Sequence, residues 1–291
     1  MQPRTMSQNQ IDALIAKNIR TSEGRHVIGQ SLLEPFKLGR DYMSIGRKVM
    51  EVDILPVGAP IWYDKDPQFT AVVIGEDGTV PYEVIKGERV YQDPFTIAVL
   101  VRVPVEEVAY RRFNVLDREQ KKGRIEMGKE EDRKVFAALM AAGTSATGHN
   151  TVVTSSSGLT KRTVLDLIAS LADHNAPTMA MLMHPRQHTD LMAFGSNDFD
   201  PITRLEVRKT GYLGDLYGIP VRTSYLMTPG DVIAVSEPNL TGVISIRIDL
   251  DQWDSPDPQK LHYGWVFFEL LSVIVMIAQD VAVAQVTGKV S

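Results

Sequence analysis

Residues 114–143 have the sequence NVLDREQKKGRIEMGKEEDRKVFAALMAAG. It consists mostly of straight-chain helix formers and contains no proline. Asn114 suits an N-cap, and Gly143 suits a left-handed residue after the last helical turn. We therefore predict one long helix over 114–142, about 42 Å in length at about 1.5 Å of rise per residue.

The predicted helix has two unlike parts. Its end carries an apolar stripe of Val135, Phe136, Leu139 and Met140. Residues 117–134 are mostly Asp, Glu, Lys and Arg of both signs, and two glycines there each weaken a helix by up to about 1 kcal/mol. Such a helix needs support beyond its own propensity. Two interpretations are open: a solvated helix at a domain edge, or a strut that contacts other subunits.

Composition limits the classes of function. The chain has 291 residues, of which 44% are hydrophobic, so it fits one large domain or two modest ones. Its net charge of −5 argues against a dedicated nucleic-acid binder. The absence of cysteine excludes disulfides and thiolate zinc sites. The most apolar run, 265–278, is short for a membrane span and contains Glu269, so we predict a buried strand and no membrane contact.

The N-terminal region is basic although the protein is acidic. Residues 1–50 hold eight Lys or Arg against four Asp or Glu. This bias is either ordinary variation or a sign that the arm faces something anionic. We expect residues 1–24 to form a flexible arm, with a short amphipathic helix over 7–19 that is not stable alone. Residues 25–44 show no clear period.

An extended β-arm is predicted ahead of the long helix. Strand patterns cover 45–55 and 94–103, and the segment 60–93 between them is rich in aromatic and β-branched residues broken by turn signals. We expect the two outer strands to pair as the base of a long hairpin. The alternative is a β-meander folded on its own core.

The rest of the chain alternates helix and strand patterns. We predict helices at 159–175 and 185–194. The predicted strands lie at 178–183, 211–224, 231–236, 242–250, 264–277 and 281–287.

Sequence signatures of catalysis are absent. There is no GxGxxG, P-loop, GxSxG or HExxH motif. His184 and His188 are four residues apart with Asp190 nearby, but Pro185 places His184 outside the helix, and spacing fixes no further ligand. We expect surface histidines, no cofactor and no enzyme, and a metal-dependent hydrolase remains the enzymatic alternative.

Three stretches in order carry a family resemblance. They are Val103–Phe136, which leads into the long helix; Gly211–Asp231, with GIPV followed by PG; and the apolar Gly264–Val286. This order resembles the major capsid proteins of tailed phages, whose α+β fold, also called the Johnson fold, was first described in Hong Kong 97 phage. The resemblance covers most of residues 45–288.

The resemblance implies a domain organisation. Residues 1–44 would form the N-arm, and 45–104 would be P-domain strands carrying an extended E-loop at about 57–95. Residues 105–177 would continue the P-domain with its spine helix at 114–142. The A-domain would span 178–250, and 251–291 would return to the P-domain.

The resemblance also implies roles for individual residues. The E-loop would contact a neighbouring subunit through Trp62, Lys65, Phe69, Tyr82, Lys86 and Arg89. The spine would do so through Arg118, Lys122, Glu126, Glu130 and Arg133. An axial loop would include Asn197, Asp198, Asp200 and Arg204. The arm would face the genome through Arg4, Lys17, Arg20 and Arg25.

The function implied is self-assembly. Pentamers and hexamers would build an icosahedral shell around double-stranded DNA in the virion, assembled in the host cytoplasm. Since no long helical segment precedes the arm, we expect a separate scaffolding protein, together with a portal and in some cases a decoration protein. The DNA contact would be non-specific. The alternative is an encapsulin-like protein nanocompartment with the same fold.

Some family members join subunits by a Lys–Asn isopeptide bond. Lys65 and Lys86 are available, but no asparagine follows Asn239. We therefore predict that boiled, denatured particles run as monomers, and a ladder of covalent oligomers would contradict this.

Overall fold

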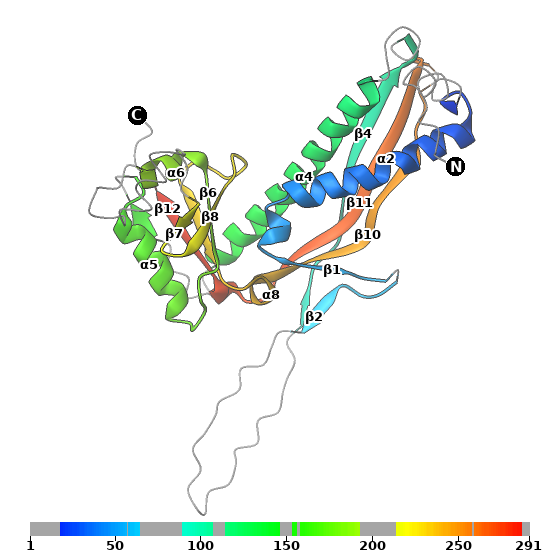
Figure 1. Ribbon diagram of the computed structural model, residues 1–291. Helices are drawn as coiled ribbons and strands as arrows, with labels where there is room; N and C mark the ends of the chain where they lie inside the picture. Colours follow the sequence, from blue (N-terminus) through cyan, green and yellow to red (C-terminus); the bar gives the residue numbers. More distant parts are fainter. Residues whose placement is uncertain are drawn as a thin grey trace, which may run out of the picture.

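The computed structural model describes residues 18–56, 58–64, 89–106, 114–145, 153–155, 158–192, 214–257 and 259–286 (Figure 1). Within them, the strands form a four-stranded sheet, a six-stranded sheet and a two-stranded ribbon. No helix among these residues has an apolar stretch long enough to cross a membrane.

The four-stranded sheet has the order β1–β10–β11–β4. Its strands are β1 (Glu51–Ile54), β10 (Gly242–Asp254), β11 (His262–Val275) and β4 (Phe95–Pro104). β10 and β11 form a long antiparallel hairpin, β4 pairs antiparallel with β11, and β1 runs parallel to β10. Two helices, α2 (Ser22–Met43) and α4 (Asn114–Gly143), lie along this sheet (Figure 1).

Both helices cover the same face of the sheet. Alternate residues of β4 and β11 point toward them, including Val101, Trp265 and Phe267, all of which are buried. Phe36 of α2 stacks on Phe267 with ring centroids 4.8 Å apart. Met127 and Leu139 bring α4 into the same core. The period of two in the strands therefore meets apolar positions of two helices.

The six-stranded sheet has the order β5–β12–β9–β6–β8–β7. Its strands are β5 (Val153–Ser155), β12 (Val281–Val286), β9 (Asp231–Val235), β6 (Ala180–Met183), β8 (Ile219–Thr223) and β7 (Asp215–Leu216). It packs with the helices α5 (Lys161–Ala172) and α6 (Pro185–Met192) in a second core. Thr160 caps α5 by accepting a hydrogen bond from the backbone N–H of Thr163.

Short elements complete the chain. They are the one-turn helices η1 (Gly46–Lys48), α8 (Pro238–Thr241) and η2 (Ala278–Asp280), and the ribbon strands β2 (Trp62–Asp64) and β3 (Arg89–Tyr91). The η2 turn joins β11 of the first sheet to β12 of the second. The same C-terminal stretch therefore belongs to both sheets.

The predicted pairing of 45–55 with 94–103 is wrong. β1 and β4 lie at opposite edges of the four-stranded sheet, separated by β10 and β11. A two-stranded pairing would bury little, whereas each strand gains a long, largely buried partner in the β10–β11 hairpin. The base of the arm is instead the short β2–β3 ribbon, where Trp62 pairs with Tyr91 and Asp64 with Arg89.

Helix α2 was not expected. It begins after Thr21, whose hydroxyl accepts from the N–H of Gly24, and it continues through Pro35. The sequence shows no helical period here because an inward position is occupied by a charged residue, Arg40, which is 2% exposed. Part of the predicted N-arm is therefore a helix that packs against the four-stranded sheet.

The long helix is confirmed, but Gly143 has a different role from the one predicted. Gly143 is still helical, and an added Cβ there would lie 2.1 Å from Cγ2 of Val283 on β12. The glycine is therefore needed for the close approach of the spine to β12. At Gly128, an added Cβ would meet nothing within 4 Å.

This contrast gives a matched pair of substitutions. Gly143→Ala should lower the free energy of unfolding by about 1–3 kcal/mol, because the Val283 side chain cannot move away freely. Gly128→Ala should raise it by up to about 1 kcal/mol through helix propensity alone. Urea unfolding of both variants tests this, and equal effects at the two positions would refute the close-approach role.

Candidate assembly surfaces and the buried ion cluster behind them

A cluster of charged side chains lies where α2, the η1 turn, α4 and the first sheet meet. We call it the junction cluster, and its members are Lys37, Arg40, Asp41, Arg47, Glu131, Asp249 and Glu269. They come from five parts of the chain: α2, η1, α4, β10 and β11. The cluster therefore connects every layer of the first sheet's domain.

The pair of Arg40 and Glu269 is at the centre of the cluster. Arg40 is 2% exposed and Glu269 is fully buried, and Nη1 of Arg40 donates to Oε2 of Glu269 at 2.5 Å. Nη2 of Arg40 also reaches Asp249 at 3.2 Å. Asp249 in turn accepts from Lys37 at 2.7 Å. These contacts hold α2 across β10 and β11.

A second arginine holds the spine. Nε of Arg47 donates to Glu131 of α4 at 2.7 Å, and Nη2 of Arg47 lies 3.7 Å from Glu269. Asp41 contacts both guanidinium groups, at 3.0 Å from Arg40 and 3.1 Å from Arg47. The two arginines therefore share their carboxylates, and the contacts form one network.

Carboxylates outnumber cations in this network. Fully ionised, Lys37, Arg40 and Arg47 carry three positive charges against four carboxylates, so one proton would neutralise the cluster. Burial and then the charge of Glu131 raise the pKa of Glu269 to about 7, although both arginines lower it. Burial also raises the pKa of Glu131, opposed by Arg47. Burial opposes the charge on Arg40, but the surrounding carboxylates raise its pKa above the usual value.

Asp132 fixes the turn between α2 and β1. One of its oxygens accepts from Oγ of Ser44 at 2.8 Å and from the N–H groups of Gly46 and Ile45 at 2.8 and 3.0 Å. Burial raises the pKa of Asp132, and these hydrogen bonds lower it in part. The carboxylate therefore acts as a cap for η1, supplied by the spine helix.

These contacts correct one expectation. The charges of 117–134 were expected to be free for contact with other subunits, but Glu131 and Asp132 are buried within the subunit. The sequence contained one indication of a buried ion cluster. Glu269 lies in the most apolar run of the chain, and a charge buried in a strand requires a partner. Nothing in the spacing identified Arg40 as that partner.

The other face of α4 is exposed and charged. Lys122 lies 3.3 Å from Glu119, Lys129 lies 2.5 Å from Glu126, and Arg133 pairs with Glu130, all at i, i+3 spacing. Arg118, Lys122, Glu126, Glu130 and Arg133 are each exposed by about half or more. Exposed pairs contribute little to stability, so this face can exchange its partners.

The ribbon projects from the β1 edge of the first sheet. Tyr63 of β2 donates to Asp53 of β1 at 2.7 Å. The guanidinium of Arg89 lies 3.9 Å from the ring centroid of Trp62 and 3.1 Å from Asp64. Trp62 and Arg89 nevertheless remain about half exposed. The predicted contacts Lys65, Phe69, Tyr82 and Lys86 lie outside the described residues.

Sequence comparison finds nothing: no family model and no curated protein matches the chain. Solved structures do match. A chain of Microbacterium phage Oxtober96 is 15% identical with a TM-score of 0.63, and the match covers 84% of this chain and 91% of that one. For the capsid structure of the cyanophage P-SCSP1u, the identity is 10%, the TM-score 0.64 and the coverages 84% and 89%. The virus-like particle from Pyrococcus furiosus is 14% identical, with a TM-score of 0.59 and coverages of 88% and 98%.

The chain has the Hong Kong 97 phage capsid fold. The expected α+β class is confirmed. The division into N-arm, E-loop, P-domain and A-domain stays a prediction, and the names spine helix for α4 and P-domain sheet for the four-stranded sheet are used below as labels for these elements.

The predicted N-arm residues have different surroundings. Arg4 and Lys17 lie outside the described residues, and Arg20 is exposed. Arg25 is largely buried, with its Nε 2.7 Å from Asp254, and its carbonyl accepts from the indole N–H of Trp265 at 3.0 Å. Arg25 therefore anchors α2 to the P-domain sheet and is no longer a candidate genome contact.

The loop predicted to make an axial contact is not described. Asn197, Asp198, Asp200 and Arg204 lie in the undescribed segment 193–213. Their axial role stays a prediction.

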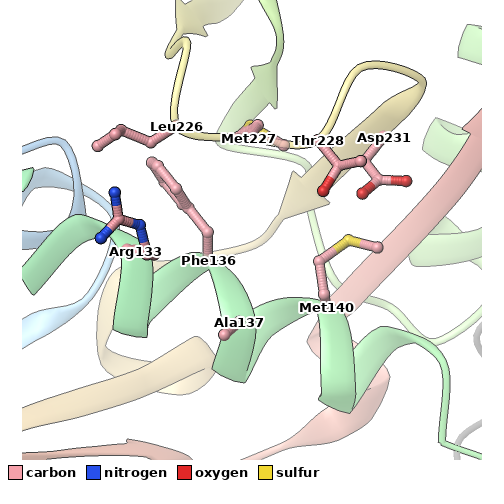
Figure 2. A pocket seen from close by; sticks show the side chains of 8 residues that line it. All are labelled: Arg133, Phe136, Ala137, Met140, Leu226, Met227, Thr228 and Asp231. Carbon is pink, nitrogen blue, oxygen red and sulfur yellow. The ribbon is translucent and has the colours of Figure 1, made fainter. Parts of the chain in front are cut away.

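A pocket of about 310 Å³ lies beside the apolar end of the spine helix (Figure 2). Phe136 and Met140 line it from α4, and Leu226, Met227 and Asp231 line it from the segment that enters β9. Arg133 stands at its edge (Figure 2). The pocket lies where the spine leaves the P-domain sheet and reaches the second sheet.

The histidines do not form a metal site within the described residues, where no group of three potential ligands is close enough to bind an ion. Nδ1 of His184 accepts from the N–H of Arg186 at 3.1 Å, and burial followed by the charge of Arg186 lowers its pKa. Asp190 accepts from the N–H of Leu159. His188 was expected at the surface, but it is buried because it lies on the inward face of α6.

The cap formed by Asp132 can be tested directly. Asp132→Ala leaves the N–H groups of Ile45 and Gly46 without their acceptor, so the free energy of unfolding should fall by about 2–4 kcal/mol. Glu130→Ala, on the exposed face of the same helix, should change it by no more than about 0.5 kcal/mol. Chemical unfolding of the two variants measures the difference, and similar losses would argue against the cap.

Glu269 predicts an unusual pH dependence. Its pKa is about 7 in the folded protein against 4.5 for an ordinary glutamate. The folded state therefore holds the proton more tightly, and the contribution of Glu269 to stability falls as pH rises between these two values. Between about pH 5 and about pH 8, the free energy of unfolding of the wild type should fall by roughly 2–3 kcal/mol more than that of Glu269→Gln.

The comparison with Glu269→Gln isolates the titration of Glu269, because the pKa shifts of the other carboxyl groups are common to both proteins. Glu126→Gln, at an exposed spine position, serves as the control and should follow the wild type. A constant difference between wild type and Glu269→Gln at the two pH values would show that Glu269 stays ionised in the folded protein.

Proposed function

We propose that the chain is the major capsid protein of a tailed phage, which assembles as pentamers and hexamers into an icosahedral shell around double-stranded DNA. The observation that carries the proposal is the capsid fold, matched over more than four-fifths of this chain and of the phage chain from Oxtober96. The proposal assigns the chain no reaction and no cofactor.

The spine helix supports an assembly role on physical grounds. Its inward side consists of Glu131, Asp132 and the apolar end of the helix, and this side is buried against the P-domain sheet. Its outer side carries charges of both signs that form ion pairs with neighbours on the same helix. Such a surface can exchange local pairs for pairs across an interface, which favours selectivity of contact over strength. We assign Arg118, Lys122, Glu126, Glu130 and Arg133 to contacts between subunits.

The E-loop and the N-arm complete the proposed contacts. Trp62 and Arg89 form an aromatic and cationic pair at the root of the E-loop, and both residue types are enriched at binding hot spots. Arg4, Lys17 and Arg20 form the proposed genome-facing set, because basic residues on an otherwise acidic chain suit non-specific phosphate contact. A separate scaffolding protein, a portal and a decoration protein are the proposed partners during assembly in the host cytoplasm.

A protein nanocompartment shell is the second candidate. The match to the virus-like particle from Pyrococcus furiosus, which covers 98% of that chain, favours it. The content of purified particles distinguishes the two functions, since a phage capsid would enclose DNA and a nanocompartment would enclose protein.

The direct test of the proposal is electron microscopy of the expressed chain, alone and with a co-expressed scaffolding protein. We expect uniform closed shells tens of nanometres across. A monodisperse monomer under both conditions would refute the capsid function.

The spine contacts have their own test. Arg118→Glu combined with Lys122→Glu should reduce the yield of sedimenting shells by at least about tenfold, because charge complementarity is lost at a repeated interface. The melting temperature of the unassembled chain should stay the same, since exposed pairs contribute little. Arg162→Glu on α5, at an 85% exposed side chain, is the control and should assemble normally. Normal assembly of the double variant would place the interface elsewhere.

A further inference from the structure

The P-domain sheet carries a pair of polar side chains on the face opposite its two helices. Asp53 of β1 lies directly beside Ser245 of β10 in the parallel register. Ile244 and Ile246, on either side of Ser245, belong to the core under the helices, so Ser245 and Asp53 point to the other face. Ser245 is nevertheless fully buried. Another part of the chain therefore covers this pair.

Tyr63 of the β2–β3 ribbon covers it. Its hydroxyl donates to Asp53 at 2.7 Å and lies 2.5 Å from the hydroxyl of Ser245. Burial raises the pKa of Tyr63 to about 12; the hydrogen bond with Ser245 opposes this rise and Asp53 adds to it. The phenol is therefore a donor at neutral pH, and one hydroxyl joins the ribbon to two strands of the sheet.

The chain that leads into the ribbon is held at two further points. The N–H of Leu55 donates to the carbonyl of Ile246 on β10 at 2.9 Å. Four residues later, the guanidinium of Arg247 donates to the carbonyl of Ala59. Arg247 follows Ile246 directly in β10, so consecutive residues of one strand hold the whole approach to the ribbon.

These contacts decide which face of the ribbon is presented. Tyr63 pairs with Val90 and Trp62 with Tyr91, so the first pair shares the face toward the sheet and the second pair shares the opposite face. Ile61, which has the same parity as Tyr63, is 2% exposed, whereas Trp62 is 49% and Tyr91 is 65% exposed. The ribbon therefore turns its aromatic pair outward.

A hydroxyl is required for this arrangement as well as a ring. A two-stranded ribbon is marginal in water, so its own pairing does not fix its direction relative to the sheet. Packing of the Tyr63 ring alone would allow it to slide, whereas hydrogen bonds are directional. Without the phenol, the buried Ser245 would also lose its partner in the ribbon.

We propose that Tyr63 is the positioning residue of the ribbon: its hydroxyl, held by Asp53 and Ser245, fixes the direction in which the predicted E-loop leaves the subunit before any neighbour is bound. A loop whose direction is already set pays less conformational entropy on association. The lock itself does not depend on shell formation, and its use in assembly rests on the proposed function.

Distances between two spin labels test the lock in the dilute, unassembled full-length chain, because the chain contains no cysteine of its own. The labels are placed on Asp64→Cys, at the end of β2, and Leu38→Cys, on α2. Asp64 is 68% exposed and its ion pair with Arg89 is of the exposed kind, which contributes little to stability. Leu38 is 69% exposed. We expect one narrow distance distribution from electron–electron double resonance.

Tyr63→Phe in this labelled background should widen the distribution by at least about twofold, because the ribbon loses its directional contact. Tyr91→Phe is the matched control. It removes a hydroxyl that binds the exposed Asp93 on the outward face of the same ribbon, and it should leave the width unchanged. A wide distribution in the chain with Tyr63 intact, or equal widths with Tyr63→Phe and Tyr91→Phe, would overturn the lock.

Two further measurements separate the lock from general loosening of the fold. Asp53→Ala with Ser245→Ala removes the partners from the sheet and should reproduce the widening with Tyr63 in place. Labels on Leu38→Cys and Glu130→Cys, on α2 and α4, should keep their width in Tyr63→Phe. Widening of this second pair would show that Tyr63 supports the domain as a whole and would overturn its positioning role.

The use of the lock in assembly has a separate readout. Tyr63→Phe should lower the yield of closed shells by about tenfold relative to Tyr91→Phe, because the ribbon must then be ordered at each contact. A widened distance distribution with an unchanged yield would overturn the role in assembly. Absence of shells from the unsubstituted chain would count against the proposed function, whereas the distance measurements would still decide the lock.

Discussion

The buried Glu269 is the constraint on which the P-domain depends. A carboxyl group in the middle of an apolar strand cannot stay ionised without a partner, and Arg40 supplies that partner at 2.5 Å. To reach it, α2 must lie across β10 and β11 with a charged residue turned inward. Removing one member of such a pair typically costs about 3–5 kcal/mol, because the other charge stays buried. The pair therefore specifies where α2 lies, whatever its net contribution to stability.

The same cluster divides the spine helix into two functional sides. Arg47 holds Glu131, and Asp132 binds the turn at Ser44 to Gly46, so two of the spine's acids serve the subunit itself. On the outer side, Lys122, Lys129 and Arg133 pair with glutamates one turn away on the same helix. A helix built this way can be rigidly held from below while its outer surface changes partners. Both properties suit a shell protein that must keep its own fold while it contacts several neighbours.

Composition and periodicity predicted the long helix and the long strands, but not the features that depend on contacts between residues far apart in the sequence. The spine helix and the strands β4, β11 and β12 follow from composition and periodicity, which depend on neighbours in sequence. Helix α2 was not predicted because Arg40 interrupts its apolar stripe. Arg40 faces inward to pair with Glu269, which lies 229 residues away in the sequence. The pairing of β1 with β10 was not predicted either, because strand propensity does not identify which distant strand is the partner. Gly143 looked like a helix cap, but its role depends on Val283 of a distant strand.

We propose that the outer face of the spine helix is an interface between subunits in a closed shell. A reconstruction of assembled particles by electron cryomicroscopy, at a resolution that shows side chains, tests it most directly. The account predicts that Lys122, Glu126 and Arg133 contact charged groups of a neighbouring copy. A closed shell in which this face of α4 is open to solvent in every subunit would contradict it.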